Sequence, residues 1–309
     1  MKRRPMEEID LTIGIIGLGG MGGGMAARLL GLGRQVTGYD TSAERMTDFA
    51  ALGGEAATSA RNVADRAELV IACLPSESAS FGTAFGADGV AGGAIVRTYV
   101  EMSTLGQEAM ERIAGKIEAA GIGFLDAPIS GGPKRARDGT LTAIVAGAPE
   151  VRSAAMEVLK LLSEHVFEVG DTAGQAQVVK LVNNMLSITA FVASCEALSI
   201  GVKAGLDARK MIEVINVSTG RNSATMDKFP AAILPRNFRY GGPLSIGVKD
   251  TELFLKLARS TQMPAFVGTT VANLFALVAD QLGHEADYSN TIKVFEAWGG
   301  GIVVGDPEI

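Results

Sequence analysis

The stretch LTIGIIGLGGMGGGMAARLL, residues 11–30, decides the fold class. Its first part, Leu11–Gly17, is a short apolar run that ends in glycine, which is the pattern of a buried parallel strand. Met21–Leu30 then has helical character, and Gly31 and Gly33 follow it as stop signals. A strand, a glycine turn and a helix in this order predict the first unit of a doubly wound α/β domain.

The same alternation of strands and helices continues to about residue 170. Further strands are predicted at Gln35–Asp40, Glu68–Leu74, Ala94–Met102, Gly123–Ala127, Leu141–Ala146 and Val166–Val169. Helices are predicted at Ser42–Leu52, Gly106–Ala120 and Glu150–Leu162, and a loop at Pro128–Gly139. This rhythm favours a mostly parallel, Rossmann-type sheet with helices on both faces.

From residue 174 onward the pattern contains helices and no convincing strand. Helices are predicted at Gln175–Val202, Ala208–Val217 and residues 250–261, 265–282 and 289–298, with tails at 1–10 and 299–309. Residues 220–248 are rich in Gly, Pro and Asn and are predicted to be irregular. The chain therefore divides into an α/β dinucleotide-binding domain, residues 11–173, and an all-α substrate and oligomerisation domain, residues 174–309.

The composition excludes several classes of function. A net charge of −6 argues against nucleic-acid binding, which needs a basic surface. Two histidines and two distant cysteines, Cys73 and Cys195, favour buried free thiols and no metal site. No apolar stretch reaches the roughly 20 residues that span a bilayer, and the N-terminus lacks a secretory signal, so no membrane contact is expected and a cytoplasmic protein is predicted.

The glycine turn is the first candidate site. Gly17 would make the tight turn, Gly19 would let the backbone approach a pyrophosphate, and Gly22 would let the helix pack on the strand. The predicted cofactor-binding stretch is Gly17, Leu18, Gly19, Gly20, Met21 and Gly22. Asp40 ends the second strand where a carboxylate would accept hydrogen bonds from the adenosine ribose, which favours NAD and leaves NADP as the second choice.

Three other strand ends carry candidate ligand residues, because ligands of such sheets lie beyond the carboxyl ends of the strands. Leu74 and Pro75 end one strand, and Thr104 follows another. The loop Asp126–Pro133 contains Ser130, Gly131 and Gly132, whose hydroxyl and backbone amides suit a carboxylate or a similar small anion. Taken alone, the two strand ends are equally compatible with an ordinary turn, whereas the Ser-Gly-Gly loop favours an anion site over a bare turn.

Lys180 lies on the long helix together with Asn183 and Asn184. Because Lys180 and Asn184 are four residues apart, they project from one helical face. The apolar neighbours Val179 and Leu181 make a partly desolvated amine plausible, although a helical lysine is more often a solvated surface residue.

These motifs together resemble the β-hydroxyacid dehydrogenase family, from about residue 12 to 298. The resemblance implies that Gly17–Gly22, Leu74-Pro75 and Thr104 line the cofactor, and that the lysine of Lys249-Asp250 approaches it. It implies that Ser130, Gly131 and Gly132 hold the substrate carboxylate. It also implies that Lys180 is the catalytic acid and base, with Asn184 as its partner and Asn183 at the substrate.

The activity implied is hydride transfer between NAD or NADP and a small 3-hydroxy acid, such as 3-hydroxyisobutyrate, tartronate semialdehyde or threonate, by a homodimer or homotetramer. The acidic residue at position 101 is Glu, where the family often has Asp. The segment Gly220–Phe229 does not match the sequence pattern of any one substrate class. Two alternatives stay open: an imine or ketone reductase of the same fold, in which the lysine is usually replaced, and a non-catalytic dinucleotide-binding scaffold.

Overall fold

The computed structural model describes residues 11–305 and divides into two compact units, Met1–Lys180 and Leu181–Ile309. The predicted tail at residues 1–10, and the last residues of the one at 299–309, lie outside the described residues. Within the part that is described, neither cysteine forms a disulfide. Cys195 is buried, whereas Cys73 is only partly buried because it follows the carboxyl end of a strand.

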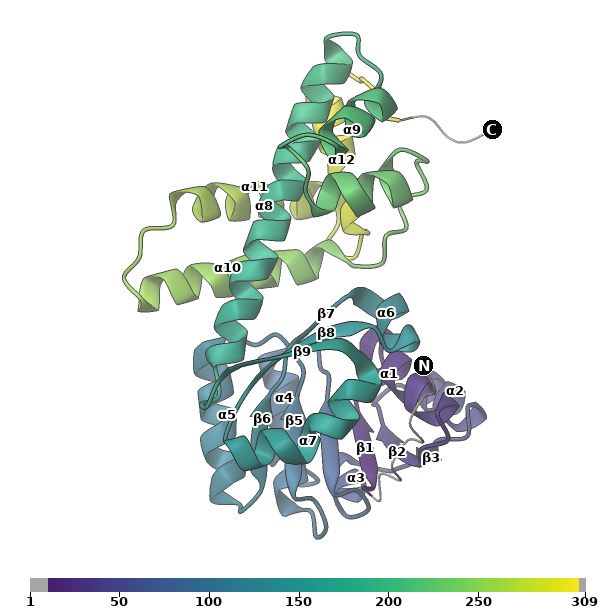
Figure 1. Ribbon diagram of the computed structural model, residues 1–309, viewed down its shortest axis with the longest axis vertical. Helices are drawn as coiled ribbons and strands as arrows, with labels where there is room; N and C mark the ends of the chain where they lie inside the picture. Colours follow the sequence, from purple (N-terminus) through teal and green to yellow (C-terminus); the bar gives the residue numbers. More distant parts are fainter. Residues whose placement is uncertain (1–10, 306–309) are drawn as a thin grey trace, which may run out of the picture. The chain divides into compact units, whose positions relative to one another are not determined.

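The first unit is built on one twisted sheet (Figure 1). Its strands are β1 (Ile13–Ile16), β2 (Val36–Tyr39), β3 (Glu55–Ala56), β4 (Leu69–Ala72), β5 (Thr98–Glu101), β6 (Gly123–Asp126), β7 (Ile129–Ser130), β8 (Leu141–Ala146) and β9 (Ser163–Gly170). The order is β3-β2-β1-β4-β5-β6-β8-β7, with β9 on β8. Pairing is parallel from β3 to β6 and between β8 and β9, and antiparallel where β8 meets β6 and β7. The predicted doubly wound α/β class is confirmed.

Helices cover both faces of this sheet. They are α1 (Gly20–Gly31), α2 (Ala43–Ala51), α3 (Ala60–Ala64), α4 (Glu77–Phe85), α5 (Gln107–Ala119), α6 (Gly132–Asp138) and α7 (Pro149–Leu162), with a short 3₁₀ turn at Val90–Gly92. Met25 of α1 packs with Ile15, whereas Ile113 of α5 packs with Val70 in a second cluster. The two clusters alternate along the strands, because successive side chains of a strand point to opposite faces.

The prediction of a plain loop at Pro128–Gly139 is wrong, because this segment contains β7 and α6. The helices α3 and α4 are likewise absent from the sequence-based prediction. The short strand β7 is formed by antiparallel pairing with β8, a tertiary contact that no local pattern announces.

The second unit consists, in its described residues, of helices joined by loops, with one isolated β-bridge between Pro243 and Asp287 (Figure 1). It holds most of α8 (Gln175–Lys203), then α9 (Ala208–Asn216), the π-helix η2 (Ala224–Ile233), α10 (Leu244–Ser260), α11 (Phe266–Leu282), the 3₁₀ turn η3 (Tyr288–Asn290) and α12 (Thr291–Trp298). The predicted all-α second half is confirmed.

Two expectations for the second unit are wrong. Residues 224–233 form η2, and residues 244–248 belong to α10, instead of irregular chain. Proline disfavours a helix interior, so Pro230 hides η2 from a sequence-based prediction. The segment after Gly299 is not a free tail where it is described: Val304 is fully buried, and its N–H donates to Glu296 Oε1 at 2.7 Å.

The expectation that no segment could span a bilayer also needs correction. Among the described helices, α8 alone is long and apolar enough to cross a membrane, judged by length and composition. Its Leu181, Phe191 and Leu198 are nevertheless buried in the protein. A core helix of a folded domain has the same composition, so the criterion does not separate the two cases.

Candidate active site

The glycine turn between β1 and α1 is shaped by close backbone contacts. Gly17 has φ +89°, and a Cβ there would clash with the carbonyl oxygen of Cys73. A Cβ at Gly22 would clash with the carbonyl oxygen of Gly17. At Gly19, by contrast, the nearest atom to a Cβ would be Arg45 Nη1 at 3.6 Å. Gly17 and Gly22 therefore shape the turn itself, whereas a Cβ at Gly19 would make only an ordinary contact with the Arg45 side chain.

Asp40 is tied to this turn by hydrogen bonds. Its Oδ2 accepts from the Leu18 N–H at 2.7 Å, and its Oδ1 accepts from the Ser42 N–H at 2.8 Å. Arg45 Nη1 lies 3.4 Å from Asp40 Oδ2, with its side chain half exposed. Asp40 thus holds the glycine turn in place. The guanidinium of Arg45 lies beside it, and Arg45 is not among the predicted site residues.

The carboxyl ends of β1, β4, β5 and β6 meet at one edge of the sheet. A Cβ at Gly17 would lie 3.0 Å from Leu74 Cδ2, and the Leu74 N–H donates to Ser103 Oγ at 2.7 Å. Pro75 is exposed, and Thr104 is partly exposed next to Ser103. Leu74, Pro75 and Thr104 therefore follow strands whose carboxyl ends lie at the same sheet edge as the glycine turn.

The Ser-Gly-Gly loop lies beside the same turn. Ser130 ends β7 and is partly exposed, while Gly131 and Gly132 have φ +139° and +77°, which favour glycine. A Cβ at Gly20 would lie 3.2 Å from Pro133 Cγ. The structure therefore places the predicted anion loop against the predicted dinucleotide loop.

The start of α8 is held against the strand ends by Gln177, which is completely buried. Its Nε2 donates to Asp126 Oδ1 at 2.8 Å and to the Ser103 carbonyl oxygen at 3.1 Å. Its Oε1 accepts from the backbone N–H groups of Leu105 and Gly106 at 3.0 and 3.2 Å. This side chain fixes α8 one turn before Lys180.

Asp126 completes that attachment. Its Oδ2 accepts from the Gly174 N–H at 2.8 Å. Burial raises the pKa of Asp126 to about 6, opposed by the hydrogen bonds from Gln177 and Gly174. Because the first turn of a helix has unsatisfied N–H groups, a carboxylate at this position stabilises the helix start.

Lys180 is buried, with 7% of its surface exposed, and it is the last residue of the first unit. Asn184 lies one turn further along α8, and its Nδ2 donates to Asp250 Oδ2 at 2.7 Å. Lys249 Nζ lies 2.9 Å from Asp250 Oδ1. Asn183 is exposed, and its Nδ2 donates to Asn184 Oδ1 at 3.2 Å. The prediction that a lysine of α8 would be partly desolvated is consistent with this burial.

A buried carboxyl group on β5 makes the free energy of unfolding depend on pH. Glu101 is fully buried, accepts from Ser103 N–H and from Tyr99 Oη–H, and burial raises its pKa to about 7. An acid whose pKa is raised by folding holds its proton longer in the folded state, so stability falls as pH rises from about 4.5 to 7.

We therefore expect the free energy of unfolding to fall by about 2 kcal/mol between pH 5.5 and 8 through Glu101. Urea unfolding at both pH values measures this change, and Glu101→Gln should remove most of it. The control is Glu118→Gln, on the exposed side of α5. An equal pH dependence in Glu101→Gln and the unmodified protein would show that this carboxyl does not titrate as described.

Sequence reasoning missed three residues of the site, Arg45, Ser103 and Gln177. Gln177 precedes Lys180 by three residues, which is the only local signal it carries. Its importance arises from contacts with residues more than 50 positions away, which spacing alone does not reveal.

Two family models match this chain. A family model described as the NAD binding domain of 6-phosphogluconate dehydrogenase matches residues 12–170. A second, described as NAD-binding of NADP-dependent 3-hydroxyisobutyrate dehydrogenase, matches residues 174–295.

Individual relatives align along most of the chain. A 3-hydroxyisobutyrate dehydrogenase of Pseudomonas aeruginosa is 35% identical over 92% of this chain and 98% of its own length. A 2-(hydroxymethyl)glutarate dehydrogenase of Eubacterium barkeri is 33% identical, covering 96% and 99%. The structure of a Mycobacterium tuberculosis 3-hydroxyisobutyrate dehydrogenase with L-serine has a TM-score of 0.83 and 28% identity, covering 92% of this chain and 98% of that one.

Proposed function

Because the chain belongs to the β-hydroxyacid dehydrogenase family, which includes 3-hydroxyisobutyrate dehydrogenase, we propose that it oxidises a small 3-hydroxy acid reversibly with Lys180 as acid and base. The family consists of NAD(P)-dependent 3-hydroxyacid dehydrogenases. The observation that carries the proposal is the burial of Lys180. Lys180 lies one helical turn after Gln177, and the side chain of Gln177 forms hydrogen bonds with Asp126 and Ser103 at the strand ends.

The residues of the glycine turn fit a dinucleotide. Gly19 has no Cβ, and among the described residues beyond its chain neighbours only the Arg45 guanidinium lies within 4 Å of where one would be, so a pyrophosphate could approach the backbone there. The N-terminal amides of α1 favour its negative charge. Leu74, Pro75, Thr104 and Lys249 would line the rest of the cofactor. When bound, the nicotinamide supplies a hydride acceptor, or a donor in the reverse direction.

The substrate carboxylate would bind Ser130, Gly131 and Gly132, where two positive-φ glycines expose backbone amides beside a hydroxyl. The substrates named for the relatives share a hydroxyl on the carbon β to a carboxylate. Lys180 would remove the hydroxyl proton during oxidation and return it during reduction, and Asn184 would orient the amine or the substrate oxygen. Asn183 would contact the substrate from the same helix.

A spectrophotometric screen tests this assignment. Hydroxyisobutyrate, glycerate, threonate, hydroxybutyrate and their sulfonate analogues are offered with NAD and with NADP. We expect turnover of at least one 3-hydroxy acid that carries a carboxylate. Reduction of cyclic imines with NADPH, without turnover of any hydroxy acid, would instead place the chain with the imine reductases.

We propose that NAD is the preferred cofactor, because the Asp40 carboxylate would repel a 2′-phosphate. Arg45 forms an ion pair with that carboxylate. Its positive charge would attract the 2′-phosphate and so allow NADP to bind as well. Arg45→Ala should therefore lower kcat/KM with NADP by about 10-fold or more, the effect of one charge-assisted hydrogen bond, and change it little with NAD. Steady-state kinetics with both cofactors measures this ratio, and an equal loss with both would contradict the assigned role.

We also propose that the protein forms a homodimer or homotetramer through its all-helical unit. Large apolar side chains are exposed there, among them Leu186, at 66%, and Phe266, at 83%. Exposed apolar side chains of this size on a folded unit favour a contact with another protein surface. Light scattering of the purified protein determines the assembly, and a monomer at micromolar concentration would contradict it.

A further inference from the structure

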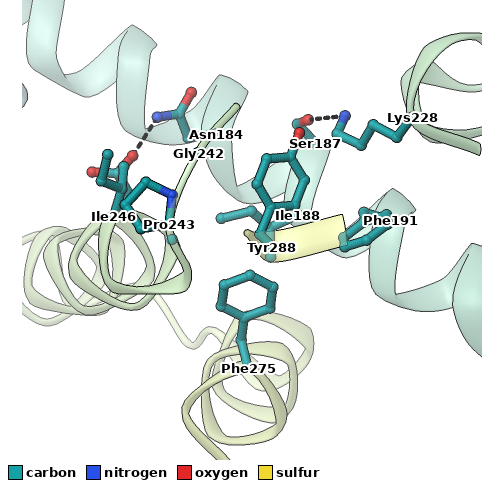
Figure 2. Close-up of a pocket in the computed structure, with 12 residues that line it drawn as sticks. Asn184, Ser187, Ile188, Phe191, Lys228, Gly242, Pro243, Ile246, Phe275 and Tyr288 are labelled. Carbon is teal, nitrogen blue, oxygen red and sulfur yellow. Dashed lines mark hydrogen bonds between the residues drawn. The ribbon is translucent and has the colours of Figure 1, made fainter. Parts of the chain in front are cut away.

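A pocket of about 150 Å³ lies within the all-helical unit, beyond Asn184 along α8 (Figure 2). Its walls are mainly apolar and come from Ile188, Phe191, Ile246 and Phe275. Ser187 and Tyr288 also line it, together with Lys228 of η2. An apolar pocket with a few polar groups is the usual form of a small-molecule site.

Lys228 is the charged group that distinguishes this pocket. Only 7% of its surface is exposed, and its Nζ donates to Ser187 Oγ and Ser223 Oγ, each at 3.3 Å (Figure 2 draws the first bond). The ring centroid of Tyr240 lies 5.8 Å from the same nitrogen. Among the described residues, no carboxylate forms an ion pair with Lys228.

A buried ammonium without a counter-ion is costly, because neutral hydroxyls replace only part of its hydration. Burial accordingly lowers the pKa of Lys228. The ammonium has three donors, and its two hydroxyl partners use two of them. The carboxylate of Asp227, which is exposed to solvent, offsets only part of the charge. The remaining donor and the incompletely compensated charge make this end of the pocket suitable for an anion, and the apolar walls strengthen that attraction.

The other charged group of the pocket, Asp250, already has polar and charged partners. Its Oδ2 accepts from Asn184 and its Oδ1 pairs with Lys249. Asn184 and Ser187 lie three residues apart on α8, a rise of roughly 4.5 Å. An anion on Lys228 would therefore lie about one helical turn from an atom held by Asn184.

We propose that the Lys228 pocket binds a second carboxylate, carried by the side chain of the substrate, so that the preferred substrates are 3-hydroxy dicarboxylic acids. This inference rests on the proposed function. Asn184 lines the pocket, and in the proposed function it also contacts the reacting end of the substrate. Lys228 is in this account a specificity-determining residue. It takes no part in the proton transfer.

The test compares two substrates that differ only in the second acid. These are 2-(hydroxymethyl)glutarate and its 5-amide, in which the distal carboxylate becomes a neutral group of similar size. We expect the unmodified protein to prefer the dicarboxylate by about 10- to 100-fold in kcat/KM, and Lys228→Gln to lose that preference. Lys228→Arg should keep most of it, because it keeps the charge. Lys210→Gln, an exposed lysine paired with Glu213, is the matched control.

Equal kcat/KM values for the two substrates in the unmodified protein, or an unchanged preference in Lys228→Gln, would overturn the inference while leaving the proposed function standing.

If no hydroxy acid is turned over, the proposed function fails, and the inference is then tested by ligand binding alone. Calorimetric titration of the unmodified protein should then show glutarate binding at least 10-fold more tightly than pentanoate. Equal binding of the two acids would refute the inference, and this measurement also serves if Lys228→Gln does not fold.

Discussion

Replacing Lys180 with alanine is expected to lower kcat for hydroxy-acid oxidation by about 10²- to 10⁴-fold, which is the usual contribution of a positioned acid or base. Binding of NAD should remain, because the glycine turn and Asp40 are untouched by the change. Stopped-flow measurement of hydride transfer and titration with NADH separate the two effects. Added primary amines should restore part of the lost rate, since a small amine can occupy the space of the missing side chain.

The matched control is Lys203→Ala, an exposed lysine in the last turn of the same helix. It should leave both hydride transfer and cofactor binding unchanged. Turnover of Lys180→Ala within a few-fold of the unmodified protein would show that another group moves the proton.

The second large effect is expected from Gly19→Ala. A methyl group fits there in the folded chain, since the nearest atom is 3.6 Å away, so the melting temperature should change little. The same methyl group would occupy the side from which a pyrophosphate approaches. The loss of one or two charge-assisted hydrogen bonds predicts a 10²- to 10⁴-fold weaker affinity for NADH, measured by fluorescence titration.

Gly22→Ala provides the contrast. Its methyl group would clash with the carbonyl oxygen of Gly17, so the turn itself must move and the protein should lose several kcal/mol of stability. Unfolding in urea measures this loss. If Gly19→Ala bound NADH normally, the dinucleotide would not lie against this turn.

The sequence of the first unit predicts its sheet well because the signals are local. Apolar strands such as Ile13–Ile16 and Leu69–Ala72 are buried on both faces, and a glycine or a proline follows each of them closely. Gly17 and Gly22 could be predicted as turn residues, since the structure leaves no room for a Cβ at either position.

The parts that sequence could not predict depend on distant contacts. Gln177 acquires its role from Asp126 and the backbone at Leu105, which lie more than 50 residues earlier in the chain. Lys228 lies in a helix that contains Pro230, within a segment whose composition is typical of irregular chain. Its burial next to Ser187 follows only from the packing of η2 against α8.

The proposed proton transfer depends on the position of one amine in the enzyme with cofactor and substrate bound. A crystal structure with NAD and a bound 3-hydroxy acid would measure the distance from Lys180 Nζ to the substrate hydroxyl oxygen directly. We expect a hydrogen bond of roughly 2.6–3.2 Å. An amine that points away from the substrate, with no water linking the two, would contradict the proposed proton transfer.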